Sequence, residues 1–377
     1  MTTVEARHAR HALIDWFDQE RLRASSVGVI GAGAIGNEVT KNLALLGVGA
    51  IEIYDLDRIE LHNLSRSAFF RETDVGRSKA LVLAERAQAL DPEIRVRGIE
   101  GDFWSTLSLH TLQTFTTVLC AVDNFEARIR LNQMCRIAGV DLVNAGIDSR
   151  FAVIETFPFK TYAECGCYEC HLPESAYQRI AERYSCGGLK KQAWEARKIP
   201  TTTITASMAG ALAVSKALRL GPANATFDAD RILVDTHSGR SSTSTLDRRV
   251  DCLGCAELGS GAKLVRSKRH LASALELLPG DPITNMTINL SESVITAYEC
   301  IRCGIPDDAG TVLMRPAGAF DDRIVVCPRC REHTMRVEMR DTMTLGELMA
   351  RSESMSLGAK YVIAHAPQGA VCVELED

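Results

Sequence analysis

The chain has 377 residues, of which 46% are hydrophobic, and this length exceeds one ordinary domain, so we expect a large domain and a smaller one. The formal net charge of −5 at pH 7 argues against general binding to nucleic acid or to a membrane surface. No apolar run approaches the roughly 18 residues that span a bilayer, and the N-terminus is charged rather than signal-like, so we expect a cytoplasmic protein without membrane segments.

The first element that we expect is a helix over residues 7–23. Its apolar residues are Leu13, Ile14, Trp16 and Phe17. The segment is also rich in arginine and histidine, so it combines apolar and basic side chains.

A glycine-rich turn, with Gly31, Gly33 and Gly36, directly follows an apolar run at 27–30 that is typical of a buried strand. Gly31 permits a tight turn, Gly33 lets a ligand approach the backbone, and Gly36 lets the next helix pack closely. A helical pattern over 35–47 starts here, and the free N–H groups at its N-terminus suit an anion. The turn therefore predicts a phosphate-binding loop.

A second apolar run at 51–54 ends in Asp55, and Asp57 follows two residues later. An acid at the end of this strand can bind the hydroxyl groups of a ribose. Strand, glycine turn, helix, strand and acid together predict a nucleotide site. The glycine pattern alone favours a nicotinamide dehydrogenase, so the residues that follow decide between the two classes.

Those residues are Asn63, Arg66 and Lys79. A dehydrogenase needs no arginine and lysine at these places, whereas a triphosphate needs cations. The sequence has no Walker Gly-Lys-Ser/Thr, so it is not a P-loop protein. A further apolar run at 118–122 leads into Asp123, where an acid suits Mg²⁺ or the positioning of a phosphate.

Strand and helix patterns alternate through the middle of the chain, which predicts an α/β fold with a Rossmann-like, doubly wound, mainly parallel sheet. Ligands of such sheets lie beyond the carboxyl ends of the strands, where the acids and the glycine turn fall. The expected strands are 27–30, 51–54, 94–97, 118–122, 140–144 and 151–156. The expected helices are 35–47, 77–90, 125–138 and 204–220.

In this set of motifs the sequence resembles the ThiF/MoeB adenylating superfamily, which includes the ubiquitin-activating enzymes. The shared pattern is the glycine turn, the acidic strand end, Asn-Leu-x-Arg at 63–66, Gly-x-x-Lys at 76–79 and Asp-Asn at 123–124. The resemblance spans roughly Arg10 to Cys255. It departs from the family in two places: Ala34 replaces a second glycine, and Ser67 stands where glutamine is common.

The resemblance implies an ATP-dependent enzyme that uses Mg²⁺. Asp55 would bind the ribose, Asn63 would orient a phosphate, and Asp57 either contributes to the nucleotide site or caps the following turn. Arg66 and Lys79 would hold the triphosphate as the α-phosphate is attacked.

Three further positions receive roles from the same resemblance. Asp123, with Asn124 beside it, would position Mg²⁺ and phosphate, and Arg128 would contact the same group or brace Asp123. Arg10 would reach the nucleotide of a partner subunit in a homodimer, or is an ordinary solvated charge.

Two sets of paired Cys-x-x-Cys motifs predict two structural Zn²⁺ sites, each made of four thiolates. The alternative for each set is four free thiols. The first set is Cys167, Cys170, Cys252 and Cys255, with Cys165 as a competing neighbour. The second set has zinc-ribbon spacing and comprises Cys300, Cys303, Cys327 and Cys330.

Of the remaining cysteines, Cys120, Cys135 and Cys372 lie in apolar patterns and are expected to be buried. Cys186 instead lies among small residues and is followed by Lys190 and Lys191, which would favour the thiolate. In ubiquitin-like activating enzymes the thioester-forming cysteine lies on the stretch that leads into the helix expected here at 204–220. The alternative is an exposed thiol of no consequence.

The Pro-Thr-Thr before that helix resembles the single-chain, homodimeric enzymes that activate UFM1-type modifiers. The gap between cysteine and proline is longer here, and no threonine directly follows the cysteine. The sequence resembles most a bacterial enzyme of this kind.

We expect two domains: residues 1–257 as the adenylation domain, and 258–377 as a small α+β domain that contains the zinc ribbon. In the second domain we expect helices at 266–278 and 343–352. The strands expected there are 324–326, 360–364 and 370–375. By analogy, this domain would hold a conjugating enzyme.

The sequence is therefore interpreted as an activating enzyme for a ubiquitin-like protein, which forms an acyl-adenylate and then a thioester on Cys186. The nearest alternative is adenylation of a sulfur-carrier protein without an enzyme thioester. A nicotinamide dehydrogenase and a non-catalytic zinc scaffold are weaker alternatives.

Overall fold

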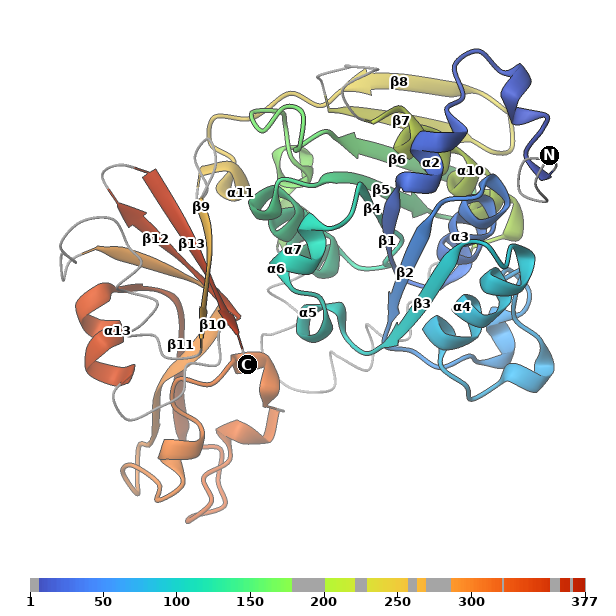
Figure 1. The fold of residues 1–377 in the computed structure, drawn as a ribbon. Coiled ribbons are helices and arrows are strands. Elements are labelled where there is room, and N and C mark those ends of the chain that lie inside the picture. The colour runs from blue at the N-terminus through green and yellow to red at the C-terminus, as the bar shows by residue number, and fades with distance from the viewer. Residues whose placement is uncertain are drawn as a thin grey trace. The chain divides into compact units, whose positions relative to one another are not determined.

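The computed structural model describes residues 7–177, 201–220, 229–256, 263–268, 286–320, 322–352, 360–366 and 369–376. The chain divides into two compact units, of which the first ends at Glu257 and the second contains β9 and the elements after it (Figure 1). Among the described residues, no helix is both long enough and apolar enough to cross a bilayer.

The first unit is built on an eight-stranded sheet of order β3-β2-β1-β4-β5-β6-β7-β8. Its first five strands run parallel, and their order reverses at β1, with β2 on one side and β4 on the other. The parallel strands are β1 (Ser26–Ile30), β2 (Ala50–Asp55), β3 (Arg95–Glu100), β4 (Thr117–Cys120) and β5 (Asp141–Ile147). The antiparallel strands are β6 (Phe151–Phe157), β7 (Asp230–Asp235) and β8 (Ser241–Thr245).

Helices cover this sheet, and the apolar side chains between helices and strands form the core of the unit. Val29, Leu119 and Val143 belong to one apolar core with residues of α3 and α10, while α7 packs against β4 and β5. Because side chains alternate along a strand, Cys120 and Asn144, which adjoin Leu119 and Val143, point to the other face of the sheet. The longer helices are α3 (Ala34–Leu46), α4 (Lys79–Leu90), α7 (Phe125–Ala138) and α10 (Thr203–Arg219). The shorter ones are α2 (Gln19–Ala24), α5 (Phe103–Thr106), α6 (Leu109–Gln113) and α11 (Leu253–Ala256).

The predicted α/β class with a doubly wound, mainly parallel sheet is confirmed, and the predicted strands and helices of this unit are present except for the N-terminal helix. The segment 7–23 is not one helix: a 3₁₀ turn at His11–Leu13 is followed by α2, because the Asp18 carboxylate accepts from the backbone N–H of Arg21 and starts a new helix. Leu13 and Trp16 are exposed, so no buried apolar face holds a continuous helix. The antiparallel strands β6, β7 and β8 extend the parallel part of the sheet, and of these β7 and β8 were not predicted.

The second unit contains a five-stranded sheet of order β11-β10-β12-β13-β9, in which only β13 and β9 pair in parallel. An apolar core lies between this sheet and α13, around Ile288, Leu348 and Val373. The elements are β9 (Lys263–Lys268), β10 (Thr287–Cys300), β11 (Met335–Thr344), α13 (Leu345–Ser352), β12 (Tyr361–Ala366) and β13 (Gly369–Glu376).

The expected helix at 343–352 and the two C-terminal strands are present in this unit, whereas two other expectations were wrong. The helix expected at 266–278 fails at its start, because 266–268 belongs to β9; the remainder lies outside the described residues. Asp322–Val325 is a 3₁₀ turn rather than a strand, since the chain turns there to bring Cys327 toward the other cysteines. The long strand β10 was missed because register shifts interrupt its alternation.

Candidate functional site

The glycine turn connects β1 to α3 and packs directly against the turn that follows β4. Gly31 has a φ of +99°, and a Cβ there would lie 2.7 Å from the carbonyl oxygen of Ala121. A Cβ on Gly36 would lie 2.0 Å from the carbonyl oxygen of Gly31, so neither position tolerates a side chain. Gly33, in contrast, has open space around its Cβ position and a φ of −74°. Its lack of a side chain leaves the backbone accessible to a ligand, as predicted for a phosphate loop.

Asp55 ends β2 and is tied to the glycine turn. Its Oδ2 accepts from the backbone N–H of Ala32 at 2.6 Å, and its Oδ1 accepts from the N–H of Asp57 at 2.7 Å. The pKa of the Asp55 carboxyl is raised above its ordinary value, mainly by burial. The two hydrogen bonds and the nearby Lys79 offset this rise in part. The carboxylate is thus held in place beside the phosphate loop, where the sequence predicted a ribose contact.

Lys79 is brought to the same place by pairing with Asp57. Its Nζ lies 2.7 Å from Oδ2 of Asp57, and its backbone N–H donates to the Asp57 carbonyl oxygen at 3.0 Å. The side chain of Lys79 is 11% exposed, and that of Asp57 is 57% exposed. Ser78 caps α4 by accepting from the N–H of Leu81, so the helix begins at the lysine rather than at 77. Asp57 therefore contacts the predicted phosphate-binding cation.

Asn63 and Arg66 lie on the segment after β2, and both contact residues of that segment. The buried Asn63 accepts from the backbone N–H of Glu60 at 2.9 Å, so its side-chain oxygen stabilises the turn. Arg66 donates to the carbonyl oxygen of His62 at 2.9 Å and is half-buried. The structure thus shows local contacts for both residues, and their phosphate contacts stay predictions.

Asn37, which the sequence analysis did not select, joins this segment to the glycine turn. It is fully buried, and its amide nitrogen donates to the carbonyl oxygens of Ala32 at 3.0 Å and Gly33 at 2.9 Å. Its side-chain oxygen accepts from the backbone N–H of Phe69 at 3.1 Å. The one available signal was an amide within an apolar helical pattern, directly after Gly36.

Asp123 and Asn124 form the turn between β4 and α7. Asp123 is exposed, which leaves its carboxylate accessible to a cation. Asn124 caps α7, since its Oδ1 accepts from the N–H of Ala127 at 2.8 Å, and its amide lies 3.4 Å from Oδ1 of Asp123. The Ala121 N–H donates to the Ile30 carbonyl oxygen at 2.7 Å, so this turn lies beside the glycine turn.

Arg128 points back under that turn. Its guanidinium donates to the carbonyl oxygens of Val122 and Ala145 and to the side-chain oxygen of Asn144. These contacts brace the backbone next to Asp123, which was one of the two roles expected for this arginine.

Two predicted residues remain, Arg10 and Cys186. Arg10 is exposed, at the start of the 3₁₀ turn His11–Leu13. Cys186 lies outside the described residues.

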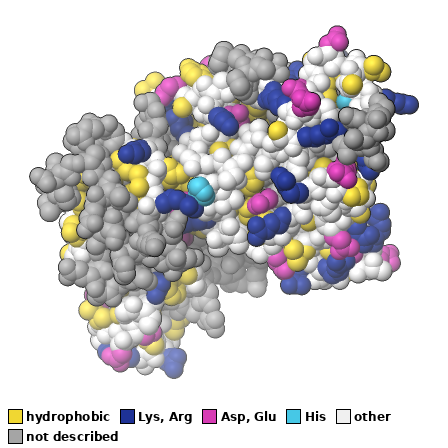
Figure 2. All heavy atoms as spheres, viewed as in Figure 1, with side chains coloured by type: hydrophobic (Ala, Val, Ile, Leu, Met, Phe, Trp, Pro, Cys, Tyr) yellow, Lys and Arg dark blue, Asp and Glu magenta, His cyan; other side chains and the backbone are white. Residues whose placement is uncertain are grey.

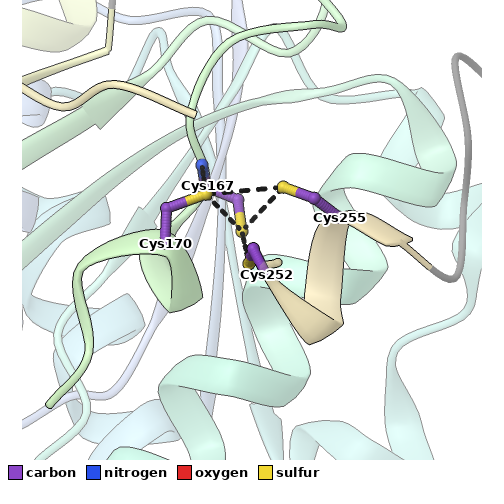
Figure 3. Close-up of side chains that lie close together, drawn as sticks. All are labelled: Cys167, Cys170, Cys252 and Cys255. Carbon is purple, nitrogen blue, oxygen red and sulfur yellow. Dashed lines mark hydrogen bonds between the residues drawn. The ribbon is translucent and has the colours of Figure 1, made fainter. Parts of the chain in front are cut away.

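The first set of cysteines converges in a buried cluster. Cys167 and Cys170 come from the turn after β6, Cys252 directly precedes α11 and Cys255 lies in α11, and their sulfur atoms are directed toward one another (Figure 3). The sulfur of Cys167 lies 3.7 Å from that of Cys252 and 3.5 Å from that of Cys255, and Cys170 lies 3.5 Å from Cys255. Four sulfurs at about 2.3 Å from a tetrahedral Zn²⁺ lie about 3.8 Å apart, so the cluster fits this ion.

Arg136 gives a second indication of charge in this cluster. It is buried, donates from Nη1 to the Cys255 sulfur at 2.8 Å, and its Nη2 has no partner among the described residues. A buried guanidinium requires a compensating negative charge, which four thiolates around a divalent ion supply. Cys165 is also buried, and burial raises the pKa of its thiol to about 12, but it does not belong to the four-sulfur group.

The second set, Cys300, Cys303, Cys327 and Cys330, forms another group whose sulfurs all lie within 4.8 Å of one another. The hydroxyl group of Thr334 lies 3.1 Å from the Cys300 sulfur and 3.2 Å from the Cys330 sulfur. Hydrogen bonding from Thr334, with the N–H groups of Arg302 and Cys303, lowers the pKa of Cys300 to about 6. Both sets predicted from the sequence are therefore assembled in the structure, and their geometry and chemistry fit zinc.

The other described cysteines lie as the sequence predicts. Cys120, Cys135 and Cys372 are buried, as expected. On the face of the molecule shown in Figure 2, acidic and basic side chains are interspersed over the first unit rather than gathered by sign.

Comparison with known proteins places this site in a family. The model of the ThiF family matches residues 5–252. The sulfur carrier protein adenylyltransferase of Thermus thermophilus is 37% identical over 158 residues, which are 41% of this chain and 58% of that protein. Ubiquitin-like modifier-activating enzyme 5 of Drosophila grimshawi is 30% identical over 204 residues, which are 51% of this chain and 50% of that protein. The chain thus spans less than two thirds of the length of these relatives.

Among solved structures, the chain is similar to that of Escherichia coli MccB with ATP. The TM-score is 0.53 and the identity 25%, over 66% of this chain and 74% of the other. The match supports the fold described above and comes from a protein whose crystals contained ATP.

Proposed function

The chain belongs to the ThiF family, and on this premise we propose that it adenylates the C-terminal carboxylate of a ubiquitin-like protein and then forms a thioester with it on Cys186. ATP and the modifier are the substrates. Pyrophosphate and AMP are the leaving groups of the two successive steps.

The observation that carries this proposal is the convergence of three groups around the glycine turn. Asp55 contacts the turn directly, Lys79 is held beside Asp55 by Asp57, and the Asp123 turn packs against Gly31. Binding of a ribose, a triphosphate and a cation needs an acid, a cation and a second acid at one loop. A nicotinamide dehydrogenase does not need the Lys79 cation. A non-catalytic scaffold needs neither the two acids nor the lysine at this loop.

In the first step, a carboxylate oxygen of the modifier attacks the α-phosphorus of ATP, and pyrophosphate leaves. Lys79 and Arg66 would stabilise the negative charge that develops on the phosphates, since fixed cations in such a site commonly contribute several kcal/mol. Asp123 would hold Mg²⁺, which supplies further neutralisation of the triphosphate when bound. The exposed carboxylate, with an amide beside it, fits such a hard cation.

In the second step, the Cys186 thiolate attacks the acyl carbon of the adenylate, a C–S bond forms, and AMP leaves. This splits one difficult acylation into two easier ones. Support for it comes from the sequence around Cys186 and from the similarity to the Drosophila modifier-activating enzyme. For the zinc sites, we propose that each four-cysteine group holds one structural Zn²⁺, which in the first unit would join the turn after β6 to α11.

The proposal extends to partners. Arg10 would complete the active site of a second copy in a homodimer, and the second unit, with its cysteine ribbon, would hold a conjugating enzyme that receives the modifier. The competing function is adenylation of a sulfur-carrier protein without an enzyme thioester, favoured by the similarity to the Thermus protein.

The test is exchange of labelled pyrophosphate into ATP, with purified ubiquitin-like proteins encoded near this chain as substrates. Exchange that requires one of these proteins is expected. Calorimetry should show binding of ATP and no comparable binding of NAD(H). Tight binding of NAD(H) without binding of ATP would contradict adenylation.

A further inference from the structure

A row of three polar side chains crosses the sheet of the first unit from β7 to β5. Asn144 on β5 is paired in register with Glu155 on β6, and Glu155 with Arg231 on β7. Asn144 and Glu155 are buried, and the Arg231 side chain is 35% exposed. The row therefore begins near the surface at β7 and runs inward toward β4.

Hydrogen bonds connect the members of this row continuously. Arg231 donates to Oε1 of Glu155 from Nε at 3.0 Å and from Nη2 at 2.6 Å. The other carboxylate oxygen, Oε2, accepts from the amide nitrogen of Asn144 at 2.6 Å. The side-chain oxygen of Asn144 in turn accepts from Arg128. A buried carboxylate thus has partners on both oxygens.

Asn144 acts as an adaptor whose orientation is determined by its neighbours. A guanidinium only donates and an ionised carboxylate only accepts, so an amide between them must turn its oxygen to Arg128 and its nitrogen to Glu155. No other arrangement of this amide satisfies both. Glu155 therefore determines which atom Asn144 presents to Arg128, although Glu155 does not contact the arginine.

At its inner end the row reaches the turn of the predicted Mg²⁺ ligand. Arg128 donates from Nη2 to the carbonyl oxygen of Val122, the residue before Asp123, and to that of Ala145 at 2.9 Å. The guanidinium is thereby fixed between β5 and this turn. A change in the orientation of Asn144 would alter the position of Arg128 and, through it, the backbone next to Asp123.

We propose that Glu155 and Asn144 are positioning residues for Asp123, acting through Arg128. This inference rests on the proposed function for its consequence in catalysis, but the positioning itself is a property of the free protein. An apolar row could join the strands equally well. It could not orient Arg128 toward Val122.

The polarity of the amide allows a reciprocal test. In Glu155→Gln, the new side chain must turn its oxygen to Arg231 and its nitrogen to Asn144, so Asn144 must turn its own nitrogen toward Arg128, donor against donor. Asn144→Asp alone places a carboxylate against Glu155. In the double variant, the carboxylate introduced at position 144 accepts from the amide introduced at position 155 on one side and from Arg128 on the other. The two single changes are therefore disruptive, and their combination restores the row.

The first measurement is amide hydrogen exchange of residues 121–128 in the free protein. Each single variant is expected to exchange about tenfold faster there, the effect of losing a charged hydrogen bond, and the double variant to return to the wild-type rate. Thr156→Val is the matched control. It alters a neighbouring buried side chain whose Oγ1 has no hydrogen-bond partner among the described residues, and it should leave exchange in this segment unchanged.

The second measurement is the affinity for ATP by calorimetry, with Mg²⁺ and with EDTA. Mg²⁺ increases the affinity for ATP, and in the single variants this increase should be about tenfold smaller than in the wild type, as is typical when partners of a metal ligand are changed. Their affinity in EDTA should stay near that of the wild type, because the glycine turn is intact. The double variant should recover the increase seen in the wild type.

Three outcomes are decisive. Unchanged exchange at 121–128 in both single variants would overturn the positioning role. If exchange is faster in both single variants and the double variant does not reverse this change, the adaptor role of Asn144 is overturned. A wild type that fails to bind ATP would contradict the proposed function, while hydrogen exchange would still decide whether Glu155 and Asn144 position the turn.

Discussion

Lys79 and Asp57 form an ion pair of 2.7 Å, so a contact within the chain holds the cation proposed to bind the triphosphate beside Asp55. This relationship predicts unequal effects for its two members. Lys79→Ala should lower pyrophosphate exchange by about 100-fold or more, the usual cost of removing one group that stabilises developing charge. Asp57→Asn should cost less than about tenfold, because its side chain is 57% exposed and such pairs contribute little.

A double variant distinguishes positioning from direct binding by Asp57. If Asp57 acts only through Lys79, Asp57→Asn should have no further effect once Lys79 is replaced by alanine. Additive losses in the exchange assay would instead indicate that Asp57 contacts the nucleotide, which is the other role considered for it.

For the metal sites, freshly purified protein should contain two Zn²⁺ per chain. Cys170→Ser and Cys330→Ser should each lower the ratio to about one, because each removes a ligand from a different four-sulfur group. Cys165→Ser is the control and should keep both ions, since Cys165 is buried nearby but does not belong to either group. Loss of zinc should also lower the melting temperature, because metal binding is coupled to folding. A ratio near zero in a folded wild type would remove both sites.

The features of this protein that could be predicted from the sequence are local ones. The glycine turn, the acid after β2 and the paired cysteines could be predicted because each motif specifies its own geometry within a few residues. Asn144 and Glu155 could not, because in the sequence each is a polar residue of a largely apolar strand with no neighbouring residue that indicates its partner. Their partnership exists only through the register of β5, β6 and β7, which no local pattern reveals.

The N-terminal segment shows the opposite failure, in which a local pattern was present without the packing that stabilises a helix. Leu13 and Trp16 are among the apolar residues of the predicted helix, but both are exposed in the structure. Short helices in water depend on burial of such a face, so the chain breaks into a 3₁₀ turn and α2.

Arg10 lies in that segment, and its proposed role is to act on the nucleotide of a second copy. Light scattering should show a homodimer, and Arg10→Ala should lower pyrophosphate exchange. Mixing Arg10→Ala with Lys79→Ala subunits should restore part of the activity, because in each mixed dimer one site receives an intact Lys79 and the partner's intact Arg10. Arg7→Ala is the matched control: Arg7 donates to the Leu90 carbonyl oxygen within its own chain, so its loss should not be rescued by mixing. Absence of rescue, or a monomer at working concentration, would contradict action between subunits.

The last prediction separates the two candidate functions through Cys186. Cys186→Ala should keep pyrophosphate exchange, because the adenylate forms before the thiol acts, and should abolish any adduct between enzyme and modifier that is sensitive to reducing agents. Asp123→Ala should instead lose both activities, because Mg²⁺ and phosphate positioning precede both steps. Cys165→Ala is the control, since burial raises the pKa of Cys165 to about 12 and disfavours its thiolate. If Cys186→Ala still forms the adduct and Cys165→Ala does not, the nucleophile is Cys165. If the wild type forms no adduct with a carrier that supports exchange, the sulfur-carrier function holds.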